Sequence, residues 1–403
     1  MENCKDKLMV KTPIYFDHAA TTPLDKKVLE KMIPYFSDNF GNANSQHMFG
    51  RNAVSAVDEA RDTIAKIVGA KSNEIYFTSG GTEADNWALR GIANAYKEKG
   101  KHIIISPIEH AAMIVTAKEL EKNGFEIDFM KVDEFGFVDL DHLRSLVRDD
   151  TILVACMMAN NEIGTIEPIK EIAKIAKDKG ALCFCDAVQA AGVLDINVKE
   201  LGVDLMSMSG HKIYGPKGIG ALYVRNGVKI ASILTGGHQE RMKRGGTTNV
   251  PAIVGFSEAF KIANSEREEN FKYVSMLRDR FIDGVIKEIP FVKLNGPRDN
   301  RLPANADFSF YYIEGESILF TLDLNGIAVS SGSACSSGSL EPSHVLLAIG
   351  VPEAVAHGSI RFSFGKHNTV EEIDYAIKTL KDAVDNLRKM SPLFNAKGEL
   401  KYV

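Results

Sequence analysis

The sequence predicts an α/β protein: a large domain in which helices cover a mostly parallel mixed sheet, followed by a smaller α+β domain. Short apolar runs alternate with amphipathic segments of helical length as far as about Pro251. Parallel strands need crossover connections, which are usually helices, so this alternation indicates a mostly parallel sheet. The runs are apolar along their whole length, as in strands that are buried on both faces. Beyond Pro251, a long charged segment leads into a region with its own strands.

The expected elements follow from these runs and from the glycines that end helices. In the large domain, we expect strands at 74–78, 101–106, 151–157, 181–185, 205–208 and 220–224. The helices between them are expected at 54–68, 83–99, 111–122 and 169–179. A long helix is expected at 257–288, strands at 307–312 and 359–363, and a final helix at 370–389. The predicted organisation is an N-terminal segment at 1–15 that packs with the small domain, a large domain at 16–256 and a small domain at 257–403.

Composition narrows the class of protein. The chain has 403 residues, of which 45% are hydrophobic and 25% charged, and its net charge is -5, so nothing favours a nucleic-acid or membrane surface. No apolar run approaches the roughly 20 residues needed to span a bilayer. The polar amino terminus lacks an apolar signal region. Five cysteines are an odd and small number, which predicts a reducing, cytoplasmic setting without a disulfide framework. Three of them lie within apolar strands and are expected to pack there: Cys156, Cys183 and Cys185.

A lysine directly follows one predicted strand. The segment DLMSMSGHKIYGPKGIG, from Asp204 to Gly220, reads as an apolar strand, a polar tetrapeptide that ends in Lys212, and a turn rich in glycine and proline. A lysine just past a buried strand is poorly solvated, which favours the neutral amine and suits Schiff-base chemistry with a carbonyl cofactor. Taken alone, the segment fits an ordinary surface lysine equally well.

Other strand ends carry polar residues where open α/β sheets bind ligands. Strand 74–78 runs into a turn with Gly81 and Thr82 at the start of a helix, which is either an anion cradle or simply a capped helix. His110 and Asp186 follow two further strands. Together these groups suit pyridoxal phosphate: N–H groups and hydroxyls for the phosphate, Lys212 for the aldehyde, Asp186 for the ring nitrogen and His110 for the ring face.

The motifs of the chain resemble those of cysteine desulfurases, which are fold-type-I pyridoxal-phosphate enzymes of the class-V aminotransferase superfamily. The matching strings run from YFDHAATTP at 15–23 to SIRFS at 359–363, and they include TSGGTEADN at 78–86, IEHAA at 108–112, NNEIGT at 160–165, CDAVQAAG at 185–192 and SGHKIYGPKGIG at 209–220. The segment SSGSACSSGSLEPSHVL at 330–346 resembles the long cysteine loop of the group I, NifS/IscS-type branch.

The resemblance implies how the cofactor is held. It makes Lys212 the Schiff-base lysine, and it makes His110 the residue that stacks on the ring and helps to move protons. It makes Asp186 the partner of the pyridinium nitrogen and places Gln189 near the ring oxygen. The implied phosphate contacts are Gly81, Thr82, Ser209, His211 and, from the partner subunit of a homodimer, Thr247.

The resemblance also implies the chemistry. Asn161 and Arg361 would orient cofactor and substrate, with Arg361 pairing with the substrate carboxylate. Cys335 lies in a run of serines and glycines with almost no apolar residue, whereas a packing cysteine usually has apolar surroundings, so we predict a reactive thiol. The Cys335 thiolate would take the sulfur of L-cysteine as a persulfide and release alanine. The sulfur would pass to an acceptor in iron–sulfur cluster assembly or transfer-RNA thiolation. No metal of its own is implied, except a cluster that Cys335 would transiently ligate with a scaffold protein.

Three alternatives stay open at the level of the sequence. An aminotransferase or a selenocysteine lyase of the same fold would keep Lys212 and Asp186, although an aminotransferase would not need Cys335. A non-catalytic platform in sulfur trafficking would be expected to have lost the lysine or the cysteine. A thiol redox sensor that used Cys335 alone would leave the cofactor residues unexplained.

Overall fold

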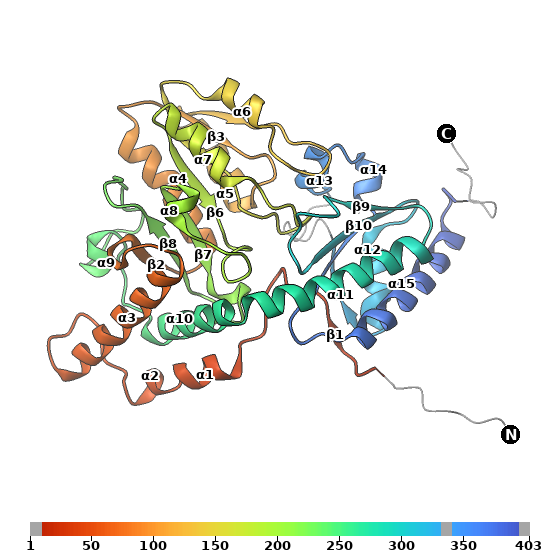
Figure 1. The fold of residues 1–403 in the computed structure, drawn as a ribbon, viewed down its shortest axis with the longest axis horizontal. Coiled ribbons are helices and arrows are strands. Elements are labelled where there is room, and N and C mark those ends of the chain that lie inside the picture. Colours follow the sequence, from red (N-terminus) through yellow and green to blue (C-terminus); the bar gives the residue numbers. More distant parts are fainter. Residues whose placement is uncertain (1–9, 332–340, 395–403) are drawn as a thin grey trace. The chain divides into compact units, whose positions relative to one another are not determined.

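The computed structural model describes residues 10–331 and 341–394, which Figure 1 draws as a coloured ribbon. Contacts divide the chain into two compact units. The larger unit comprises Thr21–Asn161 and Thr165–Glu269, and the smaller unit comprises Met1–Ala20, Glu162–Gly164 and Asn270–Val403. Each unit has its own sheet. The domain boundaries expected from the sequence stay a prediction.

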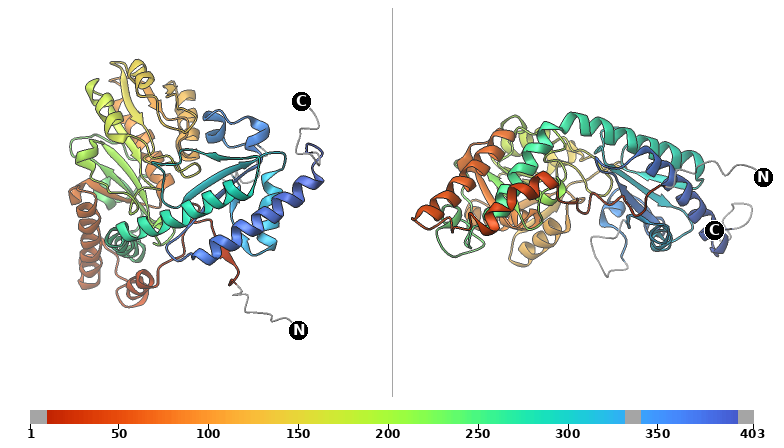
Figure 2. Two further views of the ribbon diagram at one scale, coloured as in Figure 1. Left: turned by 45° about the vertical axis from the view of Figure 1, so that its right-hand side comes forward. Right: turned by 90° about the horizontal axis from the view of Figure 1, so that it is seen from below.

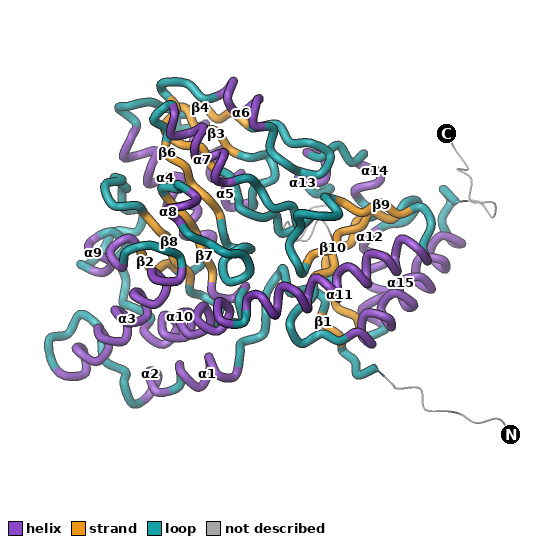
Figure 3. Tube along the Cα trace, in the orientation of Figure 1, coloured by secondary structure: helices purple, strands orange, loops and turns teal. Residues whose placement is uncertain are grey.

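The larger unit is built on a seven-stranded sheet, and its alternation of strands and helices can be followed in Figure 3. The strand order is β2 (Ile75–Thr78), β8 (Gly220–Val224), β7 (Leu205–Ser209), β6 (Leu182–Asp186), β5 (Thr151–Ala155), β3 (His102–Ile105) and β4 (Glu126–Phe129). Neighbouring strands from β7 to β4 are parallel, and β8 is antiparallel to both β2 and β7. The sheet is therefore mixed and mostly parallel, as predicted.

Helices flank this sheet because their apolar faces match the apolar strands. The helices of the larger unit are α1 (Lys26–Met32), α2 (Pro34–Ser37), α3 (Met48–Ile67), α4 (Gly81–Tyr96), α5 (Ala111–Lys122), α6 (Leu140–Leu146), α7 (Ile169–Asp178), α8 (Val198–Leu201), α9 (Gln239–Met242) and α10 (Val250–Ser265). Trp87 of α4 and Met113 of α5 share a buried core with Ile103, Leu153 and Phe184 of the strands. Helix α7 packs on β5 and β6, and α10 packs against α3. Figure 2 draws the ribbon from two further sides.

The smaller unit has an antiparallel sheet with one apolar and one polar face. Its strands pair in the order β12 (Ser330–Ser331), β13 (Ser359–Ser363), β10 (Asn305–Phe310) and β9 (Val292–Asn295), and β1 (Ile14–Tyr15) pairs with β11 (Ile327–Ala328). Its helices are α11 (Arg267–Glu288), which begins in the larger unit, α12 (Gly315–Leu324), α13 (His344–Ala348), α14 (Glu353–Ala356) and α15 (Val370–Met390). Phe308 and Phe362 pack against Phe281 of α11. Successive side chains alternate along a strand, so Asp307 and Arg361, which pair across β10 and β13, share the opposite face.

One predicted helix is wrong. The segment expected as a single helix at 257–288 forms two helices, because α10 ends at Ser265 and α11 starts at Arg267. Glu266 between them has φ -98° and ψ 3°, outside the helical region. Helix α10 begins earlier than predicted, at Val250, because Pro251 lies in the first turn, where the missing N–H of a proline leaves no helical hydrogen bond unmade.

Helix α3 also begins earlier than predicted, at Met48 instead of Val54. Its first turn is capped by His47, whose ring accepts a hydrogen bond from the Gly50 N–H. Histidine is not among the residues that usually mark a helix start, so this start could not be predicted from the local residues. Across the parts of the chain that the structure describes, none of the helices has the length and apolar character that a membrane span requires.

Candidate active site

The carboxyl ends of the parallel strands bring most of the predicted residues to one edge of the larger sheet. Gly220, the first residue of β8, pairs with Thr78 at the end of β2 and with Ser209 at the end of β7. A Cβ at position 220 would lie 2.8 Å from the Gly80 Cα and 2.5 Å from the Met208 carbonyl oxygen. Only glycine fits between these strands, so Gly220 lets the turn that precedes α4 approach Ser209.

The start of α4 is suited to a phosphate. Gly80 precedes the helix with φ 152°, a value that side chains rarely adopt, and a Cβ there would meet no atom within 4 Å. No side chain caps α4, so the N–H groups of its first turn, which include those of Gly81 and Thr82, lack an internal acceptor. The Ser209 hydroxyl oxygen is buried and has no hydrogen-bond partner among the described residues. Backbone N–H groups and a hydroxyl are the donors that a phosphate needs, so these residues fit the phosphate of pyridoxal phosphate.

Asp186 supplies a fixed carboxylate at the end of β6. It is 4% exposed, and its Oδ1 accepts hydrogen bonds from the Val188 N–H at 2.8 Å and from the Ser207 hydroxyl at 3.3 Å. Burial raises the pKa of Asp186, and the rise is opposed first by the Val188 N–H and then by the nearby His110. Both of these bonds are made to Oδ1. A carboxylate held in this way fits a protonated ring nitrogen.

Lys212 and His211 lie in the turn that follows β7, the short 3₁₀ helix Gly210–Lys212. Lys212 is half-buried, and its positive charge opposes the rise in the pKa of Asp186 that burial causes. The two side chains therefore lie near each other at the same edge of the sheet. The His211 Nδ1 lies 3.1 Å from the Thr21 hydroxyl. Burial, followed by repulsion from Lys212, lowers the pKa of His211 to about 4, so its ring is neutral at physiological pH.

His110 caps α5, and this fixes which ring nitrogen carries the proton. The Ala112 N–H donates to His110 Nδ1 at 3.1 Å, so Nδ1 is an acceptor and the proton of a neutral ring lies on Nε2. Helix α5 begins directly after His110, so the ring is held at the edge where β3 ends. A half-buried imidazole fits both stacking on a flat ring and proton transfer.

The other predicted residues occupy several places. Gln189 follows Asp186 in the same turn and is half-buried, and Asn161 is buried after β5. Thr247 belongs to the larger unit, is exposed and precedes α10. Arg361 belongs to β13 of the smaller unit, where its guanidinium pairs with Asp17 at 3.0 Å. Cys335 lies outside the described residues.

Several buried polar residues beside these groups were not predicted. Asp85 of α4 is 1% exposed, Ser207 of β7 is fully buried, and both lie next to Asp186. Asp85 could have been found from the sequence, because an acidic residue in the apolar stripe of a helix indicates a buried polar group. Asp17 gave no signal as the partner of Arg361, because the two are 344 residues apart. Cys156, Cys183 and Cys185 are buried and unbridged, which confirms that they pack.

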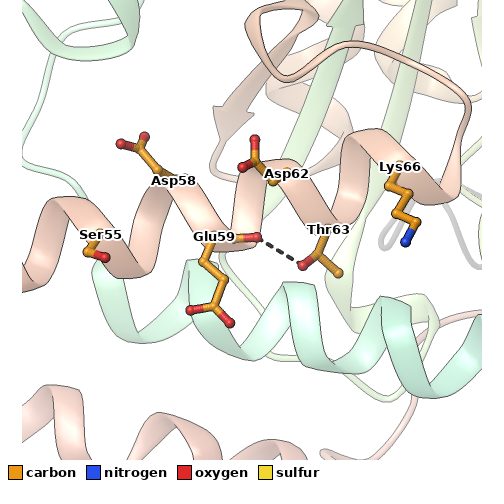
Figure 4. Close-up of a pocket in the computed structure, with 6 residues that line it drawn as sticks. All are labelled: Ser55, Asp58, Glu59, Asp62, Thr63 and Lys66. Carbon is orange, nitrogen blue, oxygen red and sulfur yellow. Dashed lines mark hydrogen bonds between the residues drawn. The ribbon is translucent and has the colours of Figure 1, made fainter.

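A separate surface hollow contains none of the predicted residues. It lies along α3 and is lined by Ser55, Asp58, Glu59, Asp62, Thr63 and Lys66, as Figure 4 shows. Its lining combines three carboxylates with one ammonium group on an exposed helix face. This arrangement is typical of a solvated helix surface and supplies none of the groups that a cofactor needs.

Comparison with known proteins identifies the family. The family described as Aminotransferase class-V matches residues 14–376. A protein named Cysteine desulfurase IscS from Dictyoglomus turgidum is 54% identical over 383 residues, which cover 95% of this chain and 97% of that protein. A protein of the same name from Methanosarcina thermophila is 53% identical over 380 residues, 94% of either chain. A solved structure named NIFS-LIKE PROTEIN has a TM-score of 0.88 at 40% identity and covers 93% of this chain and 100% of that one. The chain therefore belongs to the class-V aminotransferase family and is a cysteine desulfurase that depends on pyridoxal phosphate.

Proposed function

We propose that this desulfurase binds its cofactor at the carboxyl edge of the larger sheet. The observation that carries the proposal is the meeting of three groups there: the uncapped start of α4, the buried Ser209 hydroxyl and the Asp186 carboxylate. The bound cofactor supplies an electron sink for bonds broken at the substrate Cα. In this proposal, the phosphate contacts are Gly81, Thr82, Ser209 and His211.

The remaining cofactor contacts divide the chemistry among side chains of the same edge. Lys212 would bind the aldehyde covalently, and its amine, when free, would carry protons. His110 stacks on the ring and exchanges the proton on Nε2, a role supported by the bond that the Ala112 N–H makes to Nδ1. Asp186 holds the ring nitrogen in its protonated form, and Gln189 donates to the ring oxygen.

We propose that Asn161 and Arg361 receive the substrate. A guanidinium pairs with a carboxylate through two parallel hydrogen bonds, which fixes the direction of the bound amino acid. The ion pair with Asp17 supports this role because it holds the Arg361 guanidinium in one orientation within the smaller unit. The shared face of Arg361 and Asp307 keeps a further carboxylate beside the guanidinium.

Cys335 is proposed as the sulfur acceptor. Its thiolate attacks the sulfur of L-cysteine, an S–S bond forms, and the C–S bond breaks with its electron pair on carbon, which takes up a proton to give alanine. The product on the enzyme is a persulfide, so no external oxidant or reductant is required. From there, we propose transfer to a scaffold protein of iron–sulfur cluster assembly, where Cys335 would transiently share a cluster, or to the transfer-RNA thiolation machinery, in the cytoplasm.

Replacing Cys335 with alanine is expected to abolish sulfide release from L-cysteine while the visible absorbance of the bound cofactor is unchanged. In this account the thiol accepts the substrate sulfur and is not one of the groups that hold the cofactor. Sulfide assays with a reducing agent and absorbance spectra of the same preparation measure the two effects. Cys4→Ala is the matched control. Sulfide release by Cys335→Ala at the parental rate would show that the persulfide step is wrong.

We also propose a homodimer in which Thr247 contacts the cofactor phosphate of the partner subunit. Large exposed apolar side chains occur on α2, in the loop that follows it and at the start of α3, among them Phe36 at 64%, Phe40 at 65% and Met48 at 57% exposure. Apolar groups of this size are typical of protein interfaces. Met242, five residues before Thr247, is 70% exposed as well.

Thr247→Ala is expected to weaken cofactor binding by about tenfold, since one hydrogen bond to a charged phosphate is lost. The measurement is the rate at which the purified dimer loses cofactor to a trapping protein, with Thr248→Ala as the matched control. Sedimentation equilibrium of both variants would test the dimer itself. A parent protein that sediments as a monomer while retaining full desulfurase activity would exclude the proposed contact.

A further inference from the structure

A buried acid lies behind the proposed cofactor carboxylate. Asp85 of α4 is 1% exposed and occupies the apolar stripe of the helix with Ala88, Leu89 and Ile92, all of which are buried. Its Oδ1 has no hydrogen-bond partner among the described residues, and the Ser207 side chain lies within hydrogen-bonding reach of its carboxyl group. A buried carboxyl group costs free energy unless it is neutral or well paired.

Ser207 connects Asp85 to Asp186. Ser207 of β7 pairs directly with Asp186 of β6, and its side chain is fully buried. The Ser207 hydroxyl lies 3.3 Å from Asp186 Oδ1. A hydroxyl carries a single proton, so Ser207 can donate to only one of its two carboxyl neighbours and must accept from the other. One of the two acids therefore has to bring the second proton.

The surroundings assign that proton to Asp85. Asp186 also accepts the Val188 N–H and feels the positive charge of Lys212, both of which favour its ionised form. Among the described residues, Asp85 has Ser207 as its hydrogen-bonding neighbour and faces two acids, Asp186 and Glu109. Burial, followed by repulsion from Asp186, raises the pKa of Asp85 well above its usual range. The pair shares its charge unequally, as closely coupled acids do.

We propose that Asp85 is a positioning residue that keeps its proton, donates it in a hydrogen bond to Ser207, and so directs the Ser207 hydroxyl onto Asp186 Oδ1. With Val188 and Ser207 both bound to Oδ1, the carboxylate cannot rotate, and Oδ2 is left for the cofactor's ring nitrogen. The inference rests on the proposed role of Asp186. It adds that a second, neutral acid in the layer behind the site sets the direction and charge of the first.

Three variants separate a neutral donor from a buried charge. Asp85→Asn keeps a donor for Ser207 and carries no charge, Asp85→Ala removes the donor, and Ser207→Ala breaks the connection. In the holoenzyme, Asp85→Ala and Ser207→Ala are expected to lose pyridoxal phosphate at least about tenfold faster than Asp85→Asn, because Ser207→Ala removes one of the two donors to Asp186 and Asp85→Ala removes the bond that directs the Ser207 hydroxyl onto it. If Asp85→Asn loses the cofactor as fast as Asp85→Ala, the charge of Asp85 matters and the inference is wrong.

Infrared spectroscopy measures directly whether the Asp85 carboxyl group is protonated. The difference spectrum between the parent protein and Asp85→Asn at neutral pH is expected to show the C=O stretch of a protonated carboxylic acid in the parent, which shifts in heavy water. A carboxylate band in its place would overturn the inference and leave the proposed function intact, provided that the parent binds cofactor. A parent protein that takes up no cofactor would contradict the proposed function and the role of Asp186 together. If Asp85→Ala does not fold, the rate of cofactor loss can still be compared between Asp85→Asn and Ser207→Ala, and the infrared measurement needs only the parent and Asp85→Asn.

Discussion

Replacing Lys212 with alanine is expected to reduce desulfurase turnover by about 10³-fold or more. The amine is proposed both to bind the cofactor aldehyde and to carry the proton away from the substrate, so its loss removes two steps at once. Its charge also acts on Asp186 in the structure, which is consistent with a group within reach of the same ring. Rates of alanine formation from L-cysteine at saturating cofactor give the comparison.

A covalent label separates binding from catalysis in this variant. Borohydride reduction of the parent holoenzyme is expected to fix the cofactor on the peptide that contains Lys212, which peptide mass spectrometry identifies. The Lys212→Ala protein should carry no such label and should still bind the cofactor non-covalently through the α4 start. Lys217→Ala, five residues along the same turn, is the matched control. Labelling of another lysine in the parent would reassign the attachment point.

Replacing Asp186 with asparagine is expected to lower the turnover number by about 10²- to 10³-fold, the loss found when one preorganised electrostatic partner is removed from an active site. The amide has the same shape but cannot hold a positive charge on the ring nitrogen, and without that charge the ring is a poor electron sink. The Val188 N–H and the Ser207 hydroxyl can still donate to the amide oxygen, so the fold should be preserved.

The absorbance spectrum of the Asp186→Asn holoenzyme tests whether the lower turnover comes from losing the positive charge on the ring nitrogen. We expect the cofactor to remain bound to Lys212 while its ring nitrogen titrates at lower pH than in the parent, because the neighbouring negative charge has been lost. Asp178→Asn, at the end of α7, provides a control for removing a carboxylate elsewhere in the same unit. Turnover equal to that of the parent would show that the ring nitrogen is held by another group.

The sequence predicted much of the larger sheet because its strands are short apolar runs between clear helix boundaries. Strand β8 and helix α5 have the predicted ends, and β13 of the smaller unit does as well. The break at Glu266 was missed because no glycine or proline lies between Ser257 and Asn270 to mark it. The carboxyl ends of the strands could also be predicted, so residues such as Asp186 were candidates before the structure was known.

What the sequence could not supply were contacts made by residues far apart in the chain. The pairing of Gly220 with both Thr78 and Ser209 depends on strand order and register, which place β8 between β2 and β7. The link from Asp85 to Asp186 through Ser207 likewise requires a helix to pack on two particular strands. In each case, the local pattern indicates an element but leaves open which neighbour it meets.

The most direct test of the account is to incubate the purified protein with pyridoxal phosphate, remove the excess, and follow the absorbance spectrum while L-cysteine is added. The account predicts a coloured holoenzyme whose visible band changes on addition of L-cysteine, with alanine and protein-bound sulfur formed in equal amounts in the first turnover. A protein that stays colourless, or a coloured protein that forms no alanine from L-cysteine, would contradict it.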